Sequence, residues 1–429
     1  MSALTPIGIT NWRDSKQIFG IKDKDRLGHI YVIGKTGTGK STLLANMAIA
    51  DIARGNGLCI IDPHGDIAQT LLHYIPKARV HDVIYFNATD LKHPIAFNPL
   101  SDIQQKDFAL VTSNLVSTFK KIFAESWGPR LEHIMRYSIL SLLYYPHATL
   151  LDIQPLLTNN FFRRKVLNHV TDDALIRFWE GEFDKYPLQF KSEAIAPILN
   201  KTGIIAALEP LRAVLGQSRS SFTLKDVLNN RKILICNLSK GQIGEDAAAI
   251  LGSFLVTIIQ SAAFERATLP EEKRQLFYLY IDEVHSFITL SFVDVLAEAR
   301  KYGLSLFLSH QYLEQLNEKI RSSVFGNVGT LISFRIGAQD AETITKEFQD
   351  VFTQDDLINL PKYSMYLKLL IDGATSKPFS ATTLPLPPYT TSYAKEIIRH
   401  SKTKYGAQNY DKQINTNENN EYQQQRLFE

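Results

Sequence analysis

Residues 34–41 carry the most specific chemical signal in the chain, because they read Gly-Lys-Thr-Gly-Thr-Gly-Lys-Ser. This is the complete pattern of a phosphate-binding loop between a strand and a helix. Its glycines let the backbone wrap around phosphate oxygens, and the amide N–H groups at the start of the helix face the negative charge. We expect Lys40 to bridge the terminal phosphates of ATP and Ser41 to ligate Mg²⁺. The expected nucleotide-binding residues are Gly34, Lys35, Thr36, Gly37, Thr38, Gly39, Lys40, Ser41 and Thr42.

Two carboxylates, Asp282 and Glu283, directly follow the apolar residues 276–281. Hydrolysis of a nucleotide needs a carboxylate near the magnesium ion and a group that activates water, both at the end of a neighbouring strand. We therefore assign Asp282 to the metal shell and Glu283 to water activation. The alternative is a pair of acids that only caps a helix, and the complete P-loop in the same chain favours the catalytic assignment.

Gln311 ends another polar cluster, which follows the apolar residues 304–308. Its amide can hydrogen-bond both the γ-phosphate and the attacking water, so Gln311 is a candidate sensor of phosphate. We interpret its neighbour His310 as structural. Arg300 ends a predicted helix, where a cation is an ordinary partner of the helix dipole, and a catalytic role for this arginine is the alternative.

Apart from Arg300, these candidate residues stand at the ends of apolar segments that alternate with helical ones. Strands are expected at 29–33, 58–61, 83–86, 233–238, 276–281, 304–308, 330–334, 366–371 and 379–383. Such alternation favours a parallel sheet covered on both faces. The sequence therefore predicts an α/β fold of the RecA-like P-loop NTPase class, with a mainly parallel central sheet flanked by helices.

A long segment without convincing strands interrupts this pattern, and its apolar residues recur at helical spacing. We interpret it as an inserted all-α domain. The expected organisation is a polar lead-in (1–28), the first part of the motor domain (29–102), the all-α insertion (103–216), the second part of the motor domain (217–388), and a C-terminal helix with a polar, disordered tail (389–429).

The composition is that of an ordinary globular protein, with 45% hydrophobic and 21% charged residues. A net charge of +3 gives only weak support for nucleic-acid binding, so any DNA site must be local. Cys59 and Cys236 lie in apolar runs and are expected to be buried thiols. No run reaches the ~18 consecutive apolar residues of a membrane span, and the N-terminus lacks the apolar core of a signal peptide. We expect a cytoplasmic protein.

The order of these segments resembles the HerA/FtsK superfamily of DNA-pumping ATPases, and most resembles conjugative coupling proteins of the TraG/TraD type. The similarity runs over residues 25–386 and includes Asp-Pro-His-Gly-Asp at 62–66 and Phe-Asn-Pro-Leu at 97–100. Members of that family work as hexameric rings around DNA, in which an arginine from the next subunit completes each ATP site. By position, 18 residues after Asp282 and 11 before Gln311, that arginine would be Arg300.

This resemblance implies an ATP-driven DNA translocase of conjugative transfer or a related process. The implied partners are single- or double-stranded DNA, copies of the chain, and secretion-channel or relaxosome proteins. Coupling proteins usually carry N-terminal membrane helices, whereas 33 residues precede Gly34 here. A motor that serves a secretion channel would therefore need a partner to bring it to the membrane, whereas one that serves a nuclease or packaging system could work free in the cytosol. The alternatives are a secretion ATPase that moves protein, a DNA-packaging motor, and a nucleotide-bound assembly ring without hydrolysis.

Three further segments are candidates for contacts with partners. Residues 217–221 and 321–323 combine arginine with serines that could contact the DNA backbone, although either segment could be a solvated turn. At the C-terminus, Gln424, Leu427 and Phe428 have the spacing of the short peptide that docks on bacterial sliding clamps. A chance match is the alternative for so short a pattern.

Overall fold

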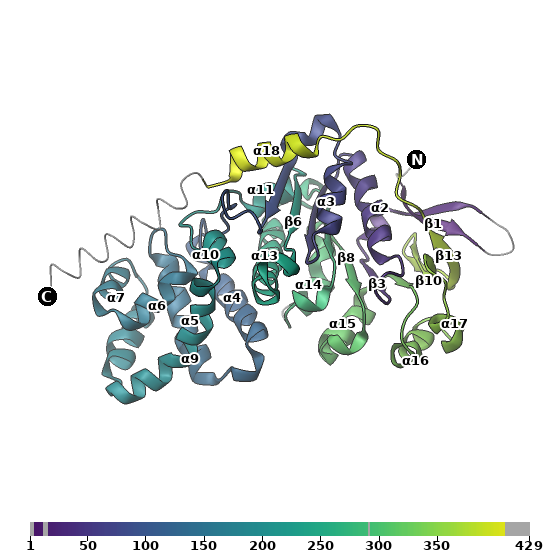
Figure 1. Cartoon of the computed structure of the whole chain (residues 1–429). Coiled ribbons are helices and arrows are strands. Elements are labelled where there is room, and N and C mark those ends of the chain that lie inside the picture. The colour runs from purple at the N-terminus through teal and green to yellow at the C-terminus, as the bar shows by residue number, and fades with distance from the viewer. Residues whose placement is uncertain (1–3, 12–15, 291, 408–429) are drawn as a thin grey trace. The chain divides into compact units, whose positions relative to one another are not determined.

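The computed structural model describes residues 4–11, 16–290 and 292–407, which form two compact units (Figure 1). The first unit comprises Met1–Phe86 and Leu224–Ile398, and the second comprises Asn87–Thr223 and Arg399–Glu429. Gln424, Leu427, Phe428 and the rest of the expected C-terminal tail lie outside the described residues. The second unit comprises more of the chain than the insertion expected at 103–216, because it begins at Asn87, ends its first segment at Thr223 and includes the segment from Arg399.

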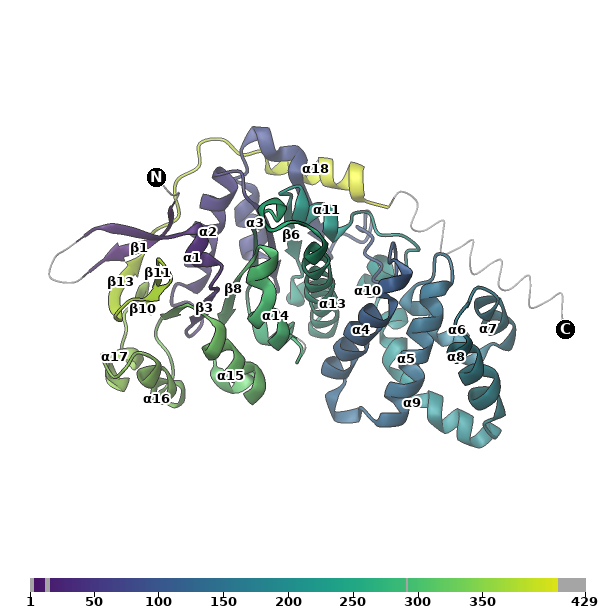
Figure 2. The same cartoon turned by 180° about the vertical axis from the view of Figure 1, so that it is seen from behind.

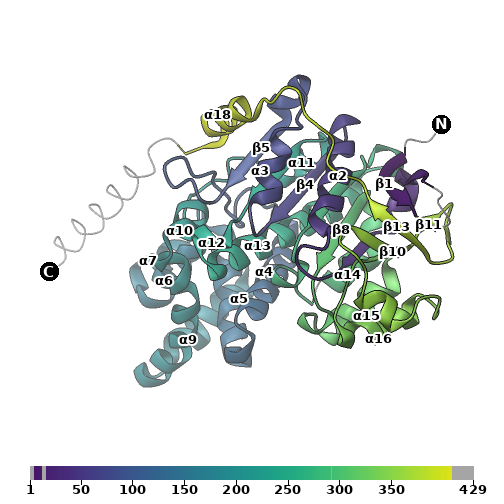
Figure 3. The same cartoon turned by 45° about the vertical axis from the view of Figure 1, so that its right-hand side comes forward.

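Eleven strands in the described part of the chain form one sheet. Their order is β2 (Ile18–Lys22), β1 (Leu4–Thr10), β13 (Phe379–Thr383), β10 (Ser364–Lys368), β9 (Thr330–Ser333), β3 (Ile30–Ile33), β8 (Leu304–His310), β7 (Phe277–Ile281), β4 (Gly57–Asp62), β6 (Ile233–Asn237) and β5 (Val83–Asn87). The strands from β9 to β6 pair in parallel, whereas those from β2 to β9 pair antiparallel. Figure 3 shows β4 and β5 towards one end of the sheet and β10 and β13 towards the other.

Helices cover both faces of the sheet. On one face, α2 (Lys40–Ala53) and α3 (Asp66–Leu72) bury apolar side chains in a common core with the strands. On the other face lie α13 (Glu245–Phe264), α14 (Phe292–Glu298) and α15 (Glu318–Asn327). Figure 2, the view of the molecule from behind, shows these three helices. The predicted fold class, a mainly parallel sheet flanked by helices, is confirmed.

Helix α13 is the most apolar helix of the first unit. Together with the turn that follows it to Thr268, it is long and apolar enough to cross a membrane, but 83% of its most apolar stretch is buried inside the protein. Its side chains instead cover the sheet, as expected for the core helix of a parallel α/β unit.

Residues 1–28 differ from the expected polar lead-in, because they supply β1, β2 and the short helix α1 (Asp23–Arg26). Ile7 and Ile21 are almost fully buried and attach this hairpin to the core. Pro6 and Gly8 interrupt the alternating pattern that would have indicated a strand. The strand expected at 366–371 also differs: β10 begins at Ser364, and a separate hairpin of β11 (Leu370–Ile371) and β12 (Ala374–Thr375) follows it.

A buried polar network ties α1 to the helix and the strand that carry site residues. Arg26 on α1 donates from Nη1 to Oδ1 of Asp51 on α2 at 2.7 Å and from Nη2 to the hydroxyl of Tyr280 on β7 at 2.7 Å. The same hydroxyl donates to Asp51 Oδ2. All three side chains are at most 1% exposed. Burial opposes the charge of Arg26, but Asp51, Tyr280 and Tyr278 together outweigh it and raise the pKa of the guanidinium. The network therefore holds α2 against β7.

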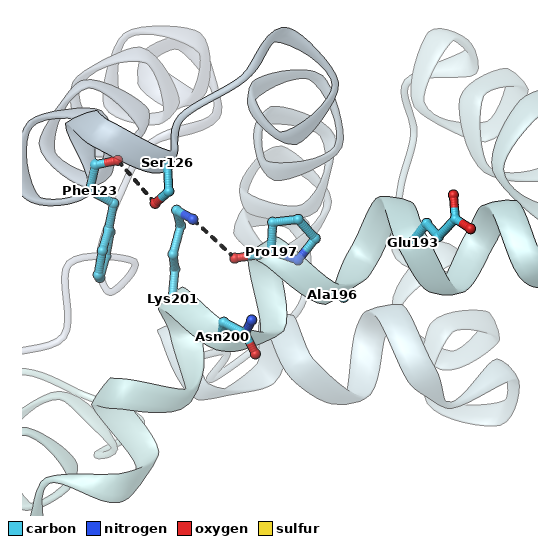
Figure 4. A pocket seen from close by; sticks show the side chains of 7 residues that line it. All are labelled: Phe123, Ser126, Glu193, Ala196, Pro197, Asn200 and Lys201. Atoms are coloured by element: carbon cyan, nitrogen blue, oxygen red, sulfur yellow. Dashed lines mark hydrogen bonds between the residues drawn. The ribbon is translucent and has the colours of Figure 1, made fainter.

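The second unit is helical, and no strand lies within residues 88–223, all of which the structure describes. Its longer helices are α4 (Phe108–Ile122), α5 (Pro129–Tyr144), α7 (Asn160–Leu167) and α9 (Leu188–Ala207). A hollow of about 540 Å³ beside α9 is lined by Phe123, Ser126, Glu193, Ala196, Pro197, Asn200 and Lys201 (Figure 4). Lys201 donates to the carbonyl of Pro197 at 3.4 Å, and Glu193 lies away from it. This lining contains no group of side chains suited to phosphate chemistry.

Candidate active site

The sheet order brings three predicted site segments together. β8 lies between β3, which leads into the P-loop, and β7, which leads into Asp282 and Glu283. The strands run parallel, with Ile33 beside His310 and Ile281 beside Leu308. Since the carboxyl ends of parallel strands meet at one edge, the P-loop, the acidic pair and Gln311 face one another across that edge.

The P-loop wraps around the ammonium group of Lys40. Lys40 Nζ donates to the carbonyl oxygens of Gly34 at 2.6 Å and of Lys35 at 3.1 Å, and the residue is 6% exposed. Gly37 and Gly39 have φ angles of 75° and 128°, which only glycine adopts without strain. Burial lowers the pKa of Lys40, whereas the nearby carboxylates of the acidic pair favour its charged form. The loop therefore presents one cation to a ligand bound in its concavity.

Asp282 has the burial and chemistry expected of a metal ligand. The residue is 4% exposed, and its buried Oδ1 makes no hydrogen bond of good geometry in the described part of the chain, although the hydroxyl of Ser309 is near enough to favour the charged form. Burial raises the pKa of this carboxyl group. A buried carboxylate oxygen without a partner is costly, and Mg²⁺ is bound by a few carboxylate and hydroxyl oxygens together with substrate phosphates. Asp282 and the hydroxyl of Ser41 therefore fit this ion.

Glu283 is held on several sides. It adopts a left-handed backbone conformation, with φ of 50°, which turns the chain sharply after β7. Its Oε1 accepts a hydrogen bond from Gln311 Nε2 and lies 3.9 Å from His64 Nε2, and its Oε2 lies 3.6 Å from His285 Nδ1. Burial opposes ionisation, but the nearby imidazole of His64, the hydrogen bond from Gln311 and the charge of Lys40 outweigh it and lower the pKa of Glu283 to about 2.

Gln311 links the P-loop to this carboxylate. Its Oε1 accepts a hydrogen bond from Thr36 Oγ1 at 3.0 Å, while its Nε2 donates to Glu283. One amide group thus contacts both the loop that would hold phosphate and the acid that would activate water. The neighbouring His310 is fully buried, with Nδ1 3.0 Å from the hydroxyl of Tyr31, and burial lowers the pKa of His310 to about 3.

His64 is a site residue that we did not identify from the sequence. It belongs to the Asp-Pro-His-Gly-Asp segment after β4, which served only as a mark of the resemblance. Asp62 shapes this turn, because its carboxylate accepts hydrogen bonds from the backbone amides of His64 and Ala68, both at 2.9 Å. The contact with Glu283 raises the pKa of His64 above 6.5. β4 is the neighbour of β7 in the sheet, and this adjacency is the signal that could have indicated His64.

Arg300 stands apart from this cluster. It lies on the short helical turn Ala299–Tyr302, which precedes the amino end of β8, whereas Gln311 follows the carboxyl end of that strand. The seven residues of β8 separate the two ends by ~20 Å. Arg300 is exposed, and its charge acts on His29 at the start of β3. It therefore cannot reach the phosphate site of its own chain.

The two serine-rich segments have different environments. In residues 217–221, Ser220 and Ser221 accept hydrogen bonds from the backbone amides of Asn98 and Ala96 at 2.9 and 3.1 Å, so they hold a turn within the second unit. In residues 321–323, Arg321 lies on α15, where Ser322 is exposed. In the first segment Ser218 and Arg219 are exposed, whereas Arg321 is half-buried, so each segment keeps accessible residues that could contact DNA.

Residues 20–366 match the family model of the type IV secretion-system coupling protein DNA-binding domain. The match spans most of the chain and includes the P-loop, the acidic pair and Gln311. The chain belongs to this family. The resemblance to conjugative coupling proteins is thereby confirmed. A separate comparison with curated protein sequences found no match.

Solved structures of coupling proteins share the fold. The bacterial conjugative coupling protein TrwBdeltaN70 is 19% identical, with 87% of this chain and 88% of that chain covered and a TM-score of 0.61. The plasmid coupling protein TrwB in complex with ADP and Mg²⁺ is 18% identical, with coverage of 87% and 89% and a TM-score of 0.61. VirB4 of Thermoanaerobacter pseudethanolicus is 14% identical, with coverage of 90% and 97% and a TM-score of 0.58.

Proposed function

We propose that the chain is an ATP-hydrolysing DNA translocase that couples Mg²⁺-dependent ATP hydrolysis to the movement of DNA in conjugative transfer. The observation that carries this proposal is the hydrogen-bonded path from Thr36 in the P-loop through Gln311 to Glu283. The path joins a phosphate-binding loop to a candidate water-activating acid. Membership of the coupling protein DNA-binding domain family supports DNA as the substrate.

Binding begins at the P-loop. Lys40 exchanges its two backbone carbonyl partners for the terminal phosphate oxygens of ATP, and the glycine-rich backbone donates its amides to the same charge. Asp282 and Ser41 would hold Mg²⁺, which would supply positive charge to offset the negative charge of the phosphates during hydrolysis. The solved structure of the plasmid coupling protein TrwB in complex with ADP and Mg²⁺ supports this choice of ligands.

Hydrolysis depends on the exchange of partners at Gln311. When its amide turns to the γ-phosphate and the attacking water, Glu283 loses a hydrogen bond that stabilises its ionised form. The pKa of the Glu283 carboxyl group then rises, and the carboxylate becomes a stronger base for the water. The resting arrangement therefore keeps Glu283 weakly basic until phosphate is present.

We further propose that six copies form a ring and that Arg300 of each copy completes the site of a neighbour. The position of Arg300 at the amino edge of its own sheet supports action in trans, because this side chain is remote from its own P-loop. An arginine in such a position stabilises the charge of the transition state.

The decisive measurement is steady-state ATP turnover without DNA, with single-stranded DNA and with double-stranded DNA. Stimulation by either form supports the translocase, and strand displacement or force assays then establish movement. Lys40→Ala serves as the control, because it removes the phosphate cation. Turnover that needs Lys40 but does not respond to any DNA would contradict the DNA-translocase proposal and favour a protein substrate.

A further inference from the structure

An exposed aromatic ring lies against the P-loop. Tyr363 is 40% exposed and precedes β10 in the sheet. Its ring is so close to the loop that a Cβ atom on Gly39 would lie 3.1 Å from Tyr363 Cδ1. The ammonium group of Lys362 lies 4.9 Å from the centroid of the same ring. An aromatic surface therefore borders the loop that we assign to the phosphates.

The backbone holds Tyr363 rigidly in an unfavourable conformation. Its φ angle is 68°, in the left-handed region that bulky residues rarely adopt. Two hydrogen bonds fix it there: its amide donates to the carbonyl of Thr38 in the P-loop at 2.8 Å, and its carbonyl accepts from the amide of Thr383 at 2.9 Å. Strain that the surroundings maintain occurs preferentially at ligand-binding sites.

The chain beyond β13 extends this border along α2. Asn46 on α2 donates from Nδ2 to the carbonyl of Leu384 at 2.7 Å, directly after the residue that is bonded to Tyr363. Leu386, two residues further, is 37% exposed. A nucleotide whose phosphates occupy the P-loop must place its base outside the loop. Tyr363 and the segment from Leu384 to Leu386 lie beside the N-terminal half of α2, so they border the space outside the loop.

We propose that Tyr363 is a base-stacking residue of the nucleotide site. This inference rests on the proposed function, because it requires that nucleotide phosphates occupy the P-loop. An aromatic side chain stacks on the flat face of a base, and the contact is strongest where the ring is preorganised. Lys362 adds a cation beside the ring.

The test compares ATP with tripolyphosphate, which has the same phosphates but no base. Binding of each ligand, with Mg²⁺, is measured by calorimetry on the full chain and on two variants. Tyr363→Asn removes the ring, and because asparagine tolerates the left-handed region, this change relieves the backbone strain. Tyr363→Phe keeps the ring. Tyr389→Asn, at another exposed tyrosine (51%), is the matched surface control.

We expect Tyr363→Asn to weaken ATP binding by roughly 10-fold or more, with tripolyphosphate unaffected, and Tyr363→Phe to retain the affinity for ATP. Equal weakening of both ligands would overturn the proposal, since it would mean that Tyr363 only shapes the P-loop. Unchanged ATP affinity in Tyr363→Asn would overturn it while leaving the proposed function intact. A wild-type protein that binds neither ligand would overturn both.

Discussion

Gln311 donates a hydrogen bond to Glu283 while it accepts one from Thr36 in the P-loop. Thr36 and Gln311 are 275 positions apart in the sequence, yet the position of β8 between β3 and β7 brings them into contact. Glu283 is thus fixed by the same side chain that is placed to detect phosphate.

Glu283→Gln should separate nucleotide binding from hydrolysis. The amide cannot accept a proton from water, so we expect turnover to fall by ~10²–10⁴-fold. ATP affinity should stay close to that of the wild type, because Lys40 and Asp282 remain. Rapid-quench turnover and equilibrium binding of ATP measure the two effects. Turnover equal to that of the wild type would show that another group activates the water.

His64 should make turnover depend on pH through its contact with Glu283. The carboxylate raises the pKa of His64, and Asp282 favours the same charge while Lys240 opposes it. Below that raised pKa, protonated His64 stabilises the ionised Glu283 and weakens it as a base. Turnover should therefore rise with pH as His64 loses its proton above pH 6.5.

The variant His64→Asn tests this pH effect, because asparagine does not titrate and keeps a donor near Glu283. We expect the rise in kcat above pH 6.5 to disappear in His64→Asn, while the Kd for ATP stays within a few-fold of the wild type. His73→Asn, on α3's C-terminal end and outside the cluster, should keep the wild-type profile. An identical pH profile in His64→Asn would assign the step to a different group.

The parts of this site whose positions follow from the sequence are those set by local pattern. The buried strands before Lys40, Asp282 and Gln311 are runs of apolar residues that end in polar clusters, so the strands could be inferred, while the roles of the residues that follow them stay predictions. The proximity of His64 to Glu283 has no local signal, because it depends on the order of β4 and β7 in the sheet. Strand β1, which pairs with the edge strand β2 and with β13, was missed because Pro6 and Gly8 break its alternation.

Arg300 should act on a neighbouring copy. Arg300→Ala is expected to lower turnover by ~10³-fold or more if the side chain stabilises the transition state. Lys40→Ala is also expected to be inactive, but for lack of nucleotide binding. Mixed assemblies of the two variants should regain activity, because some interfaces then combine an intact P-loop with an intact arginine.

The mixture must be shown to contain both variants, by mass spectrometry of the intact assembly or by differential labels. Lys301→Ala, the adjacent exposed cation, is a matched control that should keep wild-type turnover. A mixed assembly without regained activity would return Arg300 to the role of a cation at the end of its helical turn.

His29 should destabilise the fold in acid. It is 1% exposed at the start of β3, where its Nδ1 accepts a hydrogen bond from the amide of Leu306 at 3.3 Å. Burial lowers the pKa of His29 to about 4, and the charge of Arg300 contributes in the same direction. In the unfolded chain the imidazole titrates near 6.5, so the unfolded state binds more protons between these values. The stability that neutral His29 contributes is therefore complete above pH 6.5 and is lost as the pH falls towards 4.

His29→Asn removes this titration but keeps an acceptor in the place of Nδ1, and asparagine tolerates the φ angle of 62° at this position. Between pH 7.5 and pH 4.5, we expect the free energy of unfolding of the wild type to fall more than that of His29→Asn. A shift of one pKa unit corresponds to about 1.4 kcal/mol, so the difference should be on the order of 2 kcal/mol. Urea unfolding followed by tryptophan fluorescence at both pH values measures it. Parallel losses in the two proteins would mean that His29 is already protonated in the fold, or that its environment is more polar than its burial indicates.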